Sequence, residues 1–253
     1  MKRNVKSQDE ILAIEKACML ADKTLDFILP KIKPGVTEKQ IATEIVKFIR
    51  KNNASLSFRP IVAFGKNCSS IHHKPTHQKL SKNDQIMIDL GAKLNGYCSD
   101  ITRTIFTGKA TNEQKRMYKT VLDAQEKAIN FISSCYSSGE RAESRSFSTN
   151  SSQLRSNNNI FAKIVDRIAR EHIISENYPS FPHGLGHGIG RKVHEGPRLS
   201  PKSKRKLRVG MVFSVEPGIY LKDFGGVRIE DLVVLEKSGP RLLTHFTKGI
   251  IEL

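Results

Sequence analysis

The chain contains no tryptophan, few other aromatic residues and only four cysteines, and these scarcities exclude several classes of protein. The cysteines show no CxxC spacing and are too few for a disulfide framework, which favours a reducing compartment and predicts a cytoplasmic location. No apolar run approaches the roughly 18 residues that a bilayer-spanning helix needs. The first ten residues lack the apolar core of a signal peptide, so we expect neither a secretory leader nor a membrane partner.

Acidic residues are also scarce beside basic ones. The 253 residues include 42 Lys and Arg but only 25 Asp and Glu, which gives a net charge of +17. Basic residues cluster at 191–192 and 202–208. One interpretation is a weak contact with nucleic acid or the ribosome. The other, which we favour, is a solvated basic surface, because few aromatic rings are present to stack on bases.

Apolar periodicity predicts an α+β protein with a sizeable core. Thr37 and Gln40 predict a capping box at the start of the second helix. We expect helices over residues 8–29, 37–51, 112–133 and 158–173, and strands over residues 59–65, 84–92, 97–106, 211–220 and 226–236. The order helix, helix, strands occurs twice and predicts two related halves. We expect one domain over 1–253, with the Ser-, Asn- and Arg-rich residues 137–159 as a flexible insertion.

Two carboxylates occur in a strand-like stretch, IMIDLGAKLNGYCSDITRT. Asp89 lies inside an apolar run and Asp100 follows a turn, although a buried carboxylate without a partner costs several kcal/mol. Asn95-Gly96 predicts a two-residue hairpin turn. That register makes the two aspartates diagonal neighbours on one face, with Cα atoms roughly 7–8 Å apart. They could bind one or two cations, or one could cap a turn or pair with Arg103.

A second predicted hairpin repeats this arrangement near the C-terminus. Glu216 lies within GMVFSVEPGIY and Glu230 within GGVRIEDLVVLE. A loop of about five residues places the two glutamates roughly opposite each other. Arg228 alternates to the same face as Glu230 and could neutralise one carboxylate. Buried glutamates are rare without partners, so two such hairpins favour a metal site.

Between the halves, the segment FPHGLGHGIGRKVHEGP carries His183, His187 and His194. Its glycines allow tight turns that bring imidazoles close to a site. The segment is not a helical HExxH zinc motif, because Gly196 and Pro197 end any helix after His194. Hard oxygen ligands with an imidazole suit Mn²⁺, Co²⁺, Fe²⁺ or Zn²⁺. The composition therefore predicts a metal-dependent hydrolase.

These motifs resemble the pita-bread metallopeptidases, which include methionine aminopeptidases, aminopeptidase P, prolidase and creatinase. The matching segments are MIDLGAKLNGYCSDITRT, HGLGHGIGRKVHEGP, SVEPGIY and GVRIED, in the family's order. The resemblance covers nearly the whole chain outside residues 137–159. It implies a pita-bread fold with pseudo-twofold related halves and a curved antiparallel sheet flanked by helices.

The resemblance also implies two divalent metal ions, with Mn²⁺ first and Co²⁺, Fe²⁺ or Zn²⁺ as alternatives. The implied ligands are Asp89, Asp100, His187, Glu216 and Glu230. Asp100 and Glu230 would bridge the ions. Arg228 and Thr102 would support the ligands from behind.

Catalytic roles follow from the same resemblance. Glu216 would act as general base on the attacking water, and His194 would stabilise the carbonyl oxygen in the transition state. His183 and His72 would line the substrate site. The implied activity is hydrolysis of the N-terminal peptide bond of peptide substrates.

Within the family, the motifs around the second aspartate and the histidines are most similar to those of Xaa-Pro peptidases. The alternative is a methionine aminopeptidase, although the segment NCSSIHHKPTHQKL matches that group only at His72. A non-catalytic protein that binds ribosomes or RNA is a third hypothesis. Aminopeptidase P and prolidase normally carry a separate N-terminal domain that this sequence does not show. Peptide length and oligomeric state are therefore open, and a homodimer is one partner to consider.

Overall fold

The computed structural model describes residues 4–136 and 160–253, and the predicted flexible insertion at 137–159 lies outside them. Its helices are α1 (Gln8–Ile28), α2 (Glu38–Lys51), α3 (Asn112–Tyr136) and α4 (Ala162–Ser175), with short 3₁₀ helices η1 (Leu29–Lys31) and η2 (Gly65–Ser69). Thr37 accepts a hydrogen bond from the backbone N–H of Gln40, whose side chain accepts one from the N–H of Thr37. This arrangement confirms the predicted capping box.

Each predicted strand is present but is shorter or divided. The strands are β1 (Ser55–Leu56), β2 (Ile61–Phe64), β3 (Gln85–Leu90), β4 (Ala92–Leu94), β5 (Tyr97–Cys98), β6 (Ile101–Phe106), β7 (Gly186–Gly188), β8 (Glu195–Leu199), β9 (Val212–Val215), β10 (Gly218–Leu221), β11 (Gly225–Arg228), β12 (Asp231–Glu236) and β13 (Gly239–Leu242). Four of these described strands were not predicted: β1, β7, β8 and β13. The strands form hydrogen-bonded sheets in the orders β2-β3-β6, β13-β12-β9-β7-β8, β1-β4-β5 and β10-β11.

The predicted continuous strands are interrupted at three of the acidic residues, Asp100, Glu216 and Glu230, whereas Asp89 lies inside β3. β9 ends before Glu216 and β10 begins after Pro217, which has no N–H to donate to a ladder. The pairing register is the same on both sides of each break. The β3–β6 pair therefore continues as β4–β5, and the β9–β12 pair continues as β10–β11. An antiparallel bridge between Thr102 and Glu230 then connects strands of the two halves.

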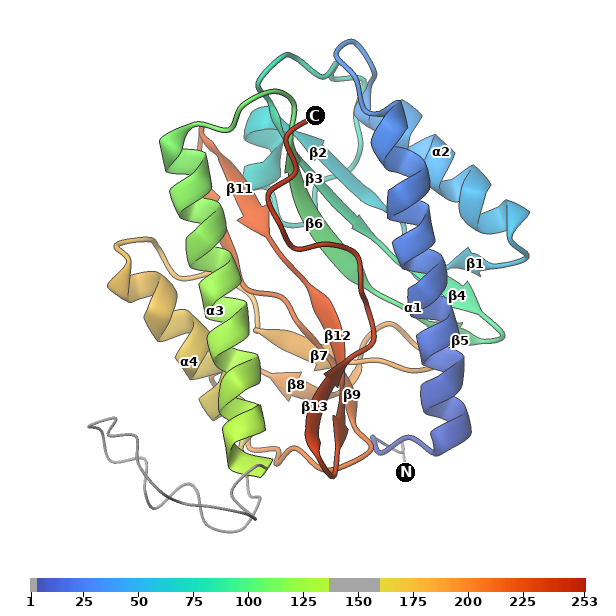
Figure 1. The fold of residues 1–253 in the computed structure, drawn as a ribbon, viewed down its shortest axis with the longest axis vertical. Coiled ribbons are helices and arrows are strands. Elements are labelled where there is room, and N and C mark those ends of the chain that lie inside the picture. The colour runs from blue at the N-terminus through green and yellow to red at the C-terminus, as the bar shows by residue number, and fades with distance from the viewer. Residues whose placement is uncertain (1–3, 137–159) are drawn as a thin grey trace.

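The helices α1 and α3 lie roughly parallel across one face of the strands, with the C-terminal segment passing between them (Figure 1). α2 packs against α1, and α4 packs against α3, so each half contributes a helix pair. On β3, Ile86 and Ile88 join the core under α1 and α2. Side chains alternate along a strand, so Asp89 faces away from these helices. The helices cover one face of the strands and the carboxylates occupy the other.

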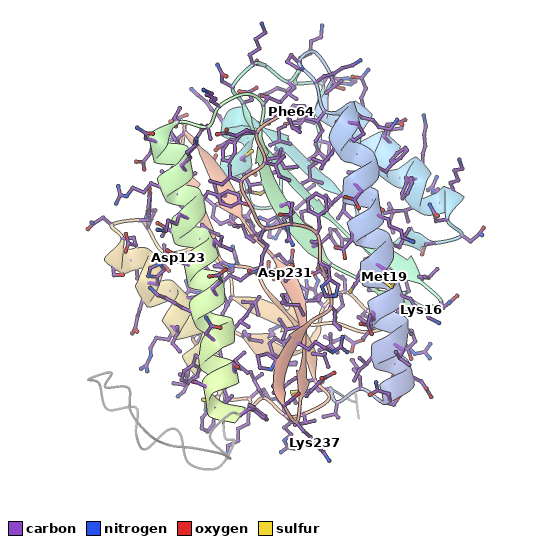
Figure 2. The ribbon with its side chains drawn as sticks, viewed as in Figure 1. Lys16, Met19, Phe64, Asp123, Asp231 and Lys237 are labelled. Carbon is purple, nitrogen blue, oxygen red and sulfur yellow. The ribbon has the colours of Figure 1, made fainter. Side chains whose placement is uncertain are left out.

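A buried ion pair links the two halves near the middle of the molecule. Arg103 on β6 donates from Nη2 to Asp231 Oδ1 on β12 (2.7 Å), and both side chains are almost fully buried. Arg103 also donates to backbone carbonyls of Glu230 and Phe246. Figure 2 places Asp231 between α1 and α3. This network positions the strand that carries Glu230 against the first half.

None of the described helices is long and apolar enough to cross a membrane. The thiols of Cys18, Cys68 and Cys98 are buried and form no disulfide within the described ranges, and Cys135 is also buried. The expected lack of a disulfide framework agrees with this arrangement.

Candidate metal centre

The first hairpin has the turn and register predicted from its sequence. Asn95 and Gly96 both adopt positive φ values, 50° and 82°, as a type I′ turn requires. Leu94 pairs with Tyr97 across the turn. Further along, Asp89 lies opposite Thr102, so Asp100 is its diagonal neighbour. Both aspartates are buried, at 9% and 4% exposure.

The second hairpin places its glutamates opposite each other, as predicted. Gly218 pairs with Arg228, and Val215 pairs with Asp231, so Glu216 and Glu230 face each other between these pairs. The connecting loop is shorter than predicted, since pairing extends to Leu221 and Gly225.

Bridging between the hairpins brings their carboxylates to one site. The backbone N–H of Glu230 donates to the carbonyl of Thr102 (3.1 Å). Together with the bonds of Arg103 and of Thr104 to the second hairpin, this bond sets that hairpin beside the first at the level of the acidic residues.

His187 reaches the same site from β7. A Cβ on Gly186 would lie 1.9 Å from the carbonyl oxygen of Ser214, so only glycine permits this close approach of β7 to β9. The N–H of His187 donates to Ser214 Oγ (3.0 Å). The imidazole Nε2 lies 3.6 Å from Asp100 Oδ2 and 3.4 Å from Glu216 Oε1.

These side chains meet in a cavity of about 530 Å³. The cavity is lined by every predicted site residue except Thr102: His72, Asp89, Asp100, His183, His187, His194, Glu216, Arg228 and Glu230. Asp100, His187 and Glu230 each offer a ligand atom, and these atoms lie within 4.8 Å of one another. Thr102 lies behind the cavity, where its hydroxyl donates to Glu230 Oε2 (2.7 Å).

In two of the carboxylates, one oxygen accepts a hydrogen bond and the second oxygen of the same group has no partner in the part of the chain that the structure describes. Arg228 Nη2 donates to Asp89 Oδ2 (2.7 Å), and Thr102 holds Glu230 Oε2. Asp89 Oδ1 and Glu230 Oε1 are buried without a hydrogen-bond partner among the described residues. Buried carboxylate oxygens without donors are unfavourable, and they suit hard cations.

The tautomer of His187 also fits a cation. Its Nδ1 donates to the carbonyl of Gly188 (3.2 Å), which leaves an Nε2 lone pair directed toward Asp100 and Glu216. Burial lowers the pKa of His187, so the neutral imidazole is favoured. A lone pair facing two carboxylates is repulsive unless a cation lies between them. The residues therefore fit divalent metal ions.

Electrostatics in the cavity support the same fit. Burial, and then repulsion from the neighbouring carboxylates, raises the pKa of Asp100 well above its ordinary value. Glu230 shifts in the same direction for the same reasons. Burial raises the pKa of Glu216 to about 7. Arg228 forms an ion pair with Asp89, and its charge also lowers the pKa of the other three carboxyl groups, but less than burial raises it. Divalent cations bound between the carboxylates would neutralise their mutual repulsion.

The remaining histidines surround the cluster in different ways. His183 Nδ1 donates to the carbonyl of Gly184, and its Nε2 accepts from the hydroxyl of Tyr220 (2.9 Å). Burial lowers the pKa of His183 to about 4, so this neutral tautomer is favoured. The ring of His194 lies 4.4 Å from that of His187. His72 lines the cavity from the segment between β2 and β3.

Sequence reasoning did not identify Tyr220 and Ser214, which hold site residues in place. The Tyr220 hydroxyl accepts from Arg228 Nη1 (3.0 Å) while it donates to His183. Ser214 Oγ donates to Glu216 Oε1 (2.9 Å). Strand alternation places Ser214 on the face of Glu216, so that signal was present in the sequence.

Two partly buried ion pairs that hold the histidine segment were also not identified. Arg170 pairs with Asp166 one helical turn away on α4 and donates to the carbonyl of His183 (2.8 Å). Lys6 pairs with Glu195, the residue after His194. The first pair has helical spacing that the sequence shows, whereas the second joins residues 189 positions apart and has no local signal.

The fold and site together define a class, the pita-bread metal-dependent hydrolases. The chain matches the sequence pattern of metallopeptidase family M24 over residues 13–143 and 151–237 and belongs to that family. It superposes on the X-Pro aminopeptidase of Thermotoga maritima with a TM-score of 0.87 and 34% identity, covering 99% of this chain and 65% of that one. The predicted family and pita-bread fold are thereby confirmed.

Other relatives carry similar names. The chain is 38% identical to the Xaa-Pro dipeptidase of Pyrococcus horikoshii over 251 residues, which covers 98% of this chain and 65% of that protein. It superposes on the recombinant prolidase of Thermococcus sibiricus with a TM-score of 0.87 and 38% identity, covering 99% of this chain and 63% of the prolidase. The chain thus spans about 65% of the length of curated relatives that it matches.

Proposed function

We propose that the protein is a dinuclear metal-dependent exopeptidase that hydrolyses the N-terminal peptide bond of Xaa-Pro peptides. The observation that carries this proposal is the convergence of four buried carboxylates and His187 on one cavity, with Asp89 Oδ1 and Glu230 Oε1 lacking donors in the described parts of the chain. The names of the relatives support the Xaa-Pro substrate class.

In this proposal the five ligands are Asp89, Asp100, His187, Glu216 and Glu230. Divalent ions bound there would polarise the scissile carbonyl and lower the pKa of a water molecule. Arg228 and Thr102 each hold one carboxylate oxygen and so aim the other into the cavity.

One of the ligands, Glu216, and three other histidines of the cavity act in the reaction itself. Glu216 takes the proton of the attacking water and returns a proton to the leaving nitrogen of proline. His194 stabilises the carbonyl oxygen as its charge develops. His183 and His72 position the peptide. Hydrolysis then adds the water's hydroxyl to the acyl carbon and a proton to the nitrogen.

The names of the relatives favour proline over the alternative of methionine aminopeptidase activity. Phe58, Pro60, Ile61 and Ile71 also line the cavity and offer apolar surface that a pyrrolidine ring could contact. The relatives described above are named for Xaa-Pro substrates and not for methionine removal.

Further properties belong to the same proposal. Mn²⁺ is the ion we assign first, with Co²⁺, Fe²⁺ or Zn²⁺ as alternatives suited to oxygen ligands with one imidazole. We propose that residues 1–253 form one catalytic domain. Assembly as a homodimer and a cytoplasmic location stay predictions from the sequence. The same holds for the basic residues 202–208, where a solvated surface is favoured over a weak contact with nucleic acid or the ribosome.

A substrate panel with metal analysis tests the proposal. The full chain is stripped with a chelator, reloaded with Mn²⁺ or Co²⁺, and assayed on Ala-Pro and Met-Ala peptides side by side. We expect metal-dependent turnover of Ala-Pro and little of Met-Ala. Absence of both turnover and bound metal would refute the proposal, and preferential Met-Ala cleavage would favour the methionine aminopeptidase alternative.

A further inference from the structure

One wall of the cavity is formed by a single short segment, residues 71–75, which we call the His72 wall. Ile71, His72, His73, Lys74 and Pro75 all line the cavity. The wall lies between η2 and β3, outside any helix or strand. Its position must therefore be set by contacts with other elements.

Glu38, in the first turn of α2, makes the contacts that hold this wall. Its carboxylate is fully buried and accepts five hydrogen bonds. Oε1 accepts from the backbone N–H of Phe64 (2.9 Å) and from Asn67 Nδ2 (2.8 Å). Oε2 accepts from His73 Nε2 (2.8 Å), from the N–H of Thr76 (2.7 Å) and from its hydroxyl (2.6 Å).

These donors flank the wall on both sides. Phe64 ends β2 (Figure 2), and Asn67 belongs to η2, so both precede the wall. His73 is part of the wall, and Thr76 directly follows it. One carboxylate therefore ties the entry and the exit of the segment to α2, which itself packs against β2.

The ionised carboxylate of Glu38 is suited to anchoring the wall, because a buried charge is stable only while its hydrogen-bond donors stay in place. Burial opposes ionisation of Glu38, but the hydrogen bonds from Asn67, His73 and Thr76 outweigh it and lower the pKa. Charge-assisted hydrogen bonds are about twice as strong as neutral ones. Loss of these hydrogen bonds would leave a buried charge without donors, which is strongly unfavourable. The folded position of the wall and the ionised state of Glu38 therefore stabilise each other.

We propose that Glu38 is a positioning residue that sets the place of His72 and the rest of the His72 wall for the peptide substrate. This inference rests on the proposed Xaa-Pro peptidase function. Glu38 touches neither the proposed metal ligands nor the cavity. Its influence passes through the wall, so it acts on substrate binding and leaves metal binding intact.

Glu38→Gln is the test variant, because glutamine keeps the shape but loses the charge. The matched control is Glu44→Gln on the same helix, whose carboxylate pairs with Lys31 and Lys47 near the surface. Thr76→Val removes one of the five hydrogen bonds to Glu38, together with the bond that the hydroxyl accepts from the N–H of Gln78, and serves as a milder variant. Each metal-loaded protein is measured for KM, kcat, bound metal and hydrogen exchange of residues 66–79.

We expect Glu38→Gln to raise the KM for Ala-Pro about tenfold, which is less than the roughly hundredfold cost of a misplacement of about 1 Å, because the other contacts of the wall remain. We expect kcat and bound metal to stay within about twofold of wild type. Exchange of residues 66–79 becomes faster, Thr76→Val shifts KM in the same direction by less, and Glu44→Gln changes nothing.

An unchanged KM with faster exchange would overturn the proposal, and so would loss of bound metal. If Glu38→Gln does not fold, Thr76→Val decides, and an unchanged KM in that variant overturns it. The failure of the proposed function is seen separately, as absence of turnover in the wild type. In that case, unchanged exchange of residues 66–79 in Glu38→Gln would still refute the positioning role.

Discussion

Replacing Asp100 with asparagine is expected to change stability in opposite directions with and without divalent ions. In the metal-free protein, burial and repulsion from Glu230, Asp89 and Glu216 raise the pKa of Asp100. Removing its charge relieves this repulsion, so we expect the metal-free variant to be at least as stable as wild type. With metal present the same change removes a proposed bridging ligand.

The size of the metal effect follows from linkage. An ion present at about one hundred times its Kd stabilises the folded state by about 2.7 kcal/mol. For a domain of this size, each kcal/mol shifts the Tm by about 2–4 °C, so metal raises the wild-type Tm by about 5–11 °C. We expect Asp100→Asn to lose most of that shift together with its activity.

Thermal unfolding with and without Mn²⁺, alongside metal analysis and the Ala-Pro assay, measures both effects. Asp223→Asn is the matched control, because Asp223 is exposed at the tip of the β10–β11 hairpin and has a φ of 64°, which asparagine accepts. This control should keep the full shift.

Two results would refute the reasoning. One is a variant that keeps the wild-type metal shift, because Asp100 would then not bind metal. The other is a metal-free variant that melts several degrees below wild type, because the carboxylate would then be stabilising by itself.

Three further predictions concern pH, stability and catalysis. Burial raises the pKa of Glu216 from 4.5 to about 7, so its contribution to metal-free stability is present below pH 4.5 and is lost as pH rises through 7. Urea midpoints should show this slope in wild type and less of it in Glu216→Gln. Arg103→Met removes the shorter ion pair of buried Asp231 and leaves the longer one to Lys248 (3.4 Å). It also removes the donor to the buried carbonyls of Glu230 and Phe246, so the free energy of unfolding should fall by about 3–5 kcal/mol. A loss below about 1 kcal/mol, typical of surface pairs, would contradict it. Arg170→Met frees the carbonyl of His183 and should lower kcat/KM about tenfold with metal content unchanged. Loss of metal in that variant would contradict the assigned role.

Local patterns in the sequence were sufficient to predict the two hairpins. The Asn95-Gly96 turn accepts positive φ at both positions, and alternation then determines which residues share a face. Asp89 and Asp100 are therefore diagonal neighbours for reasons confined to about twenty residues of chain. The helices follow from apolar periodicity and from capping residues such as Thr37 for the same reason.

Strand lengths were predicted less well, because a ladder ends where backbone geometry changes. Pro217 cannot donate to a neighbour, so the strands on either side of it are separate. An apolar run does not reveal this interruption, since both flanking segments remain buried. The predicted strands were accordingly too long at the carboxylates.

By itself, the sequence determined which residue types are available and which of them share a hairpin face, because those properties depend on neighbours in the chain. Only the tertiary structure decided that Thr102 bonds to Glu230, that Arg228 holds Asp89, and that Glu38 anchors the wall around His72. Each of these contacts joins residues more than thirty positions apart. Their geometry is set by the packing of helices and sheets against one another, which no local period encodes.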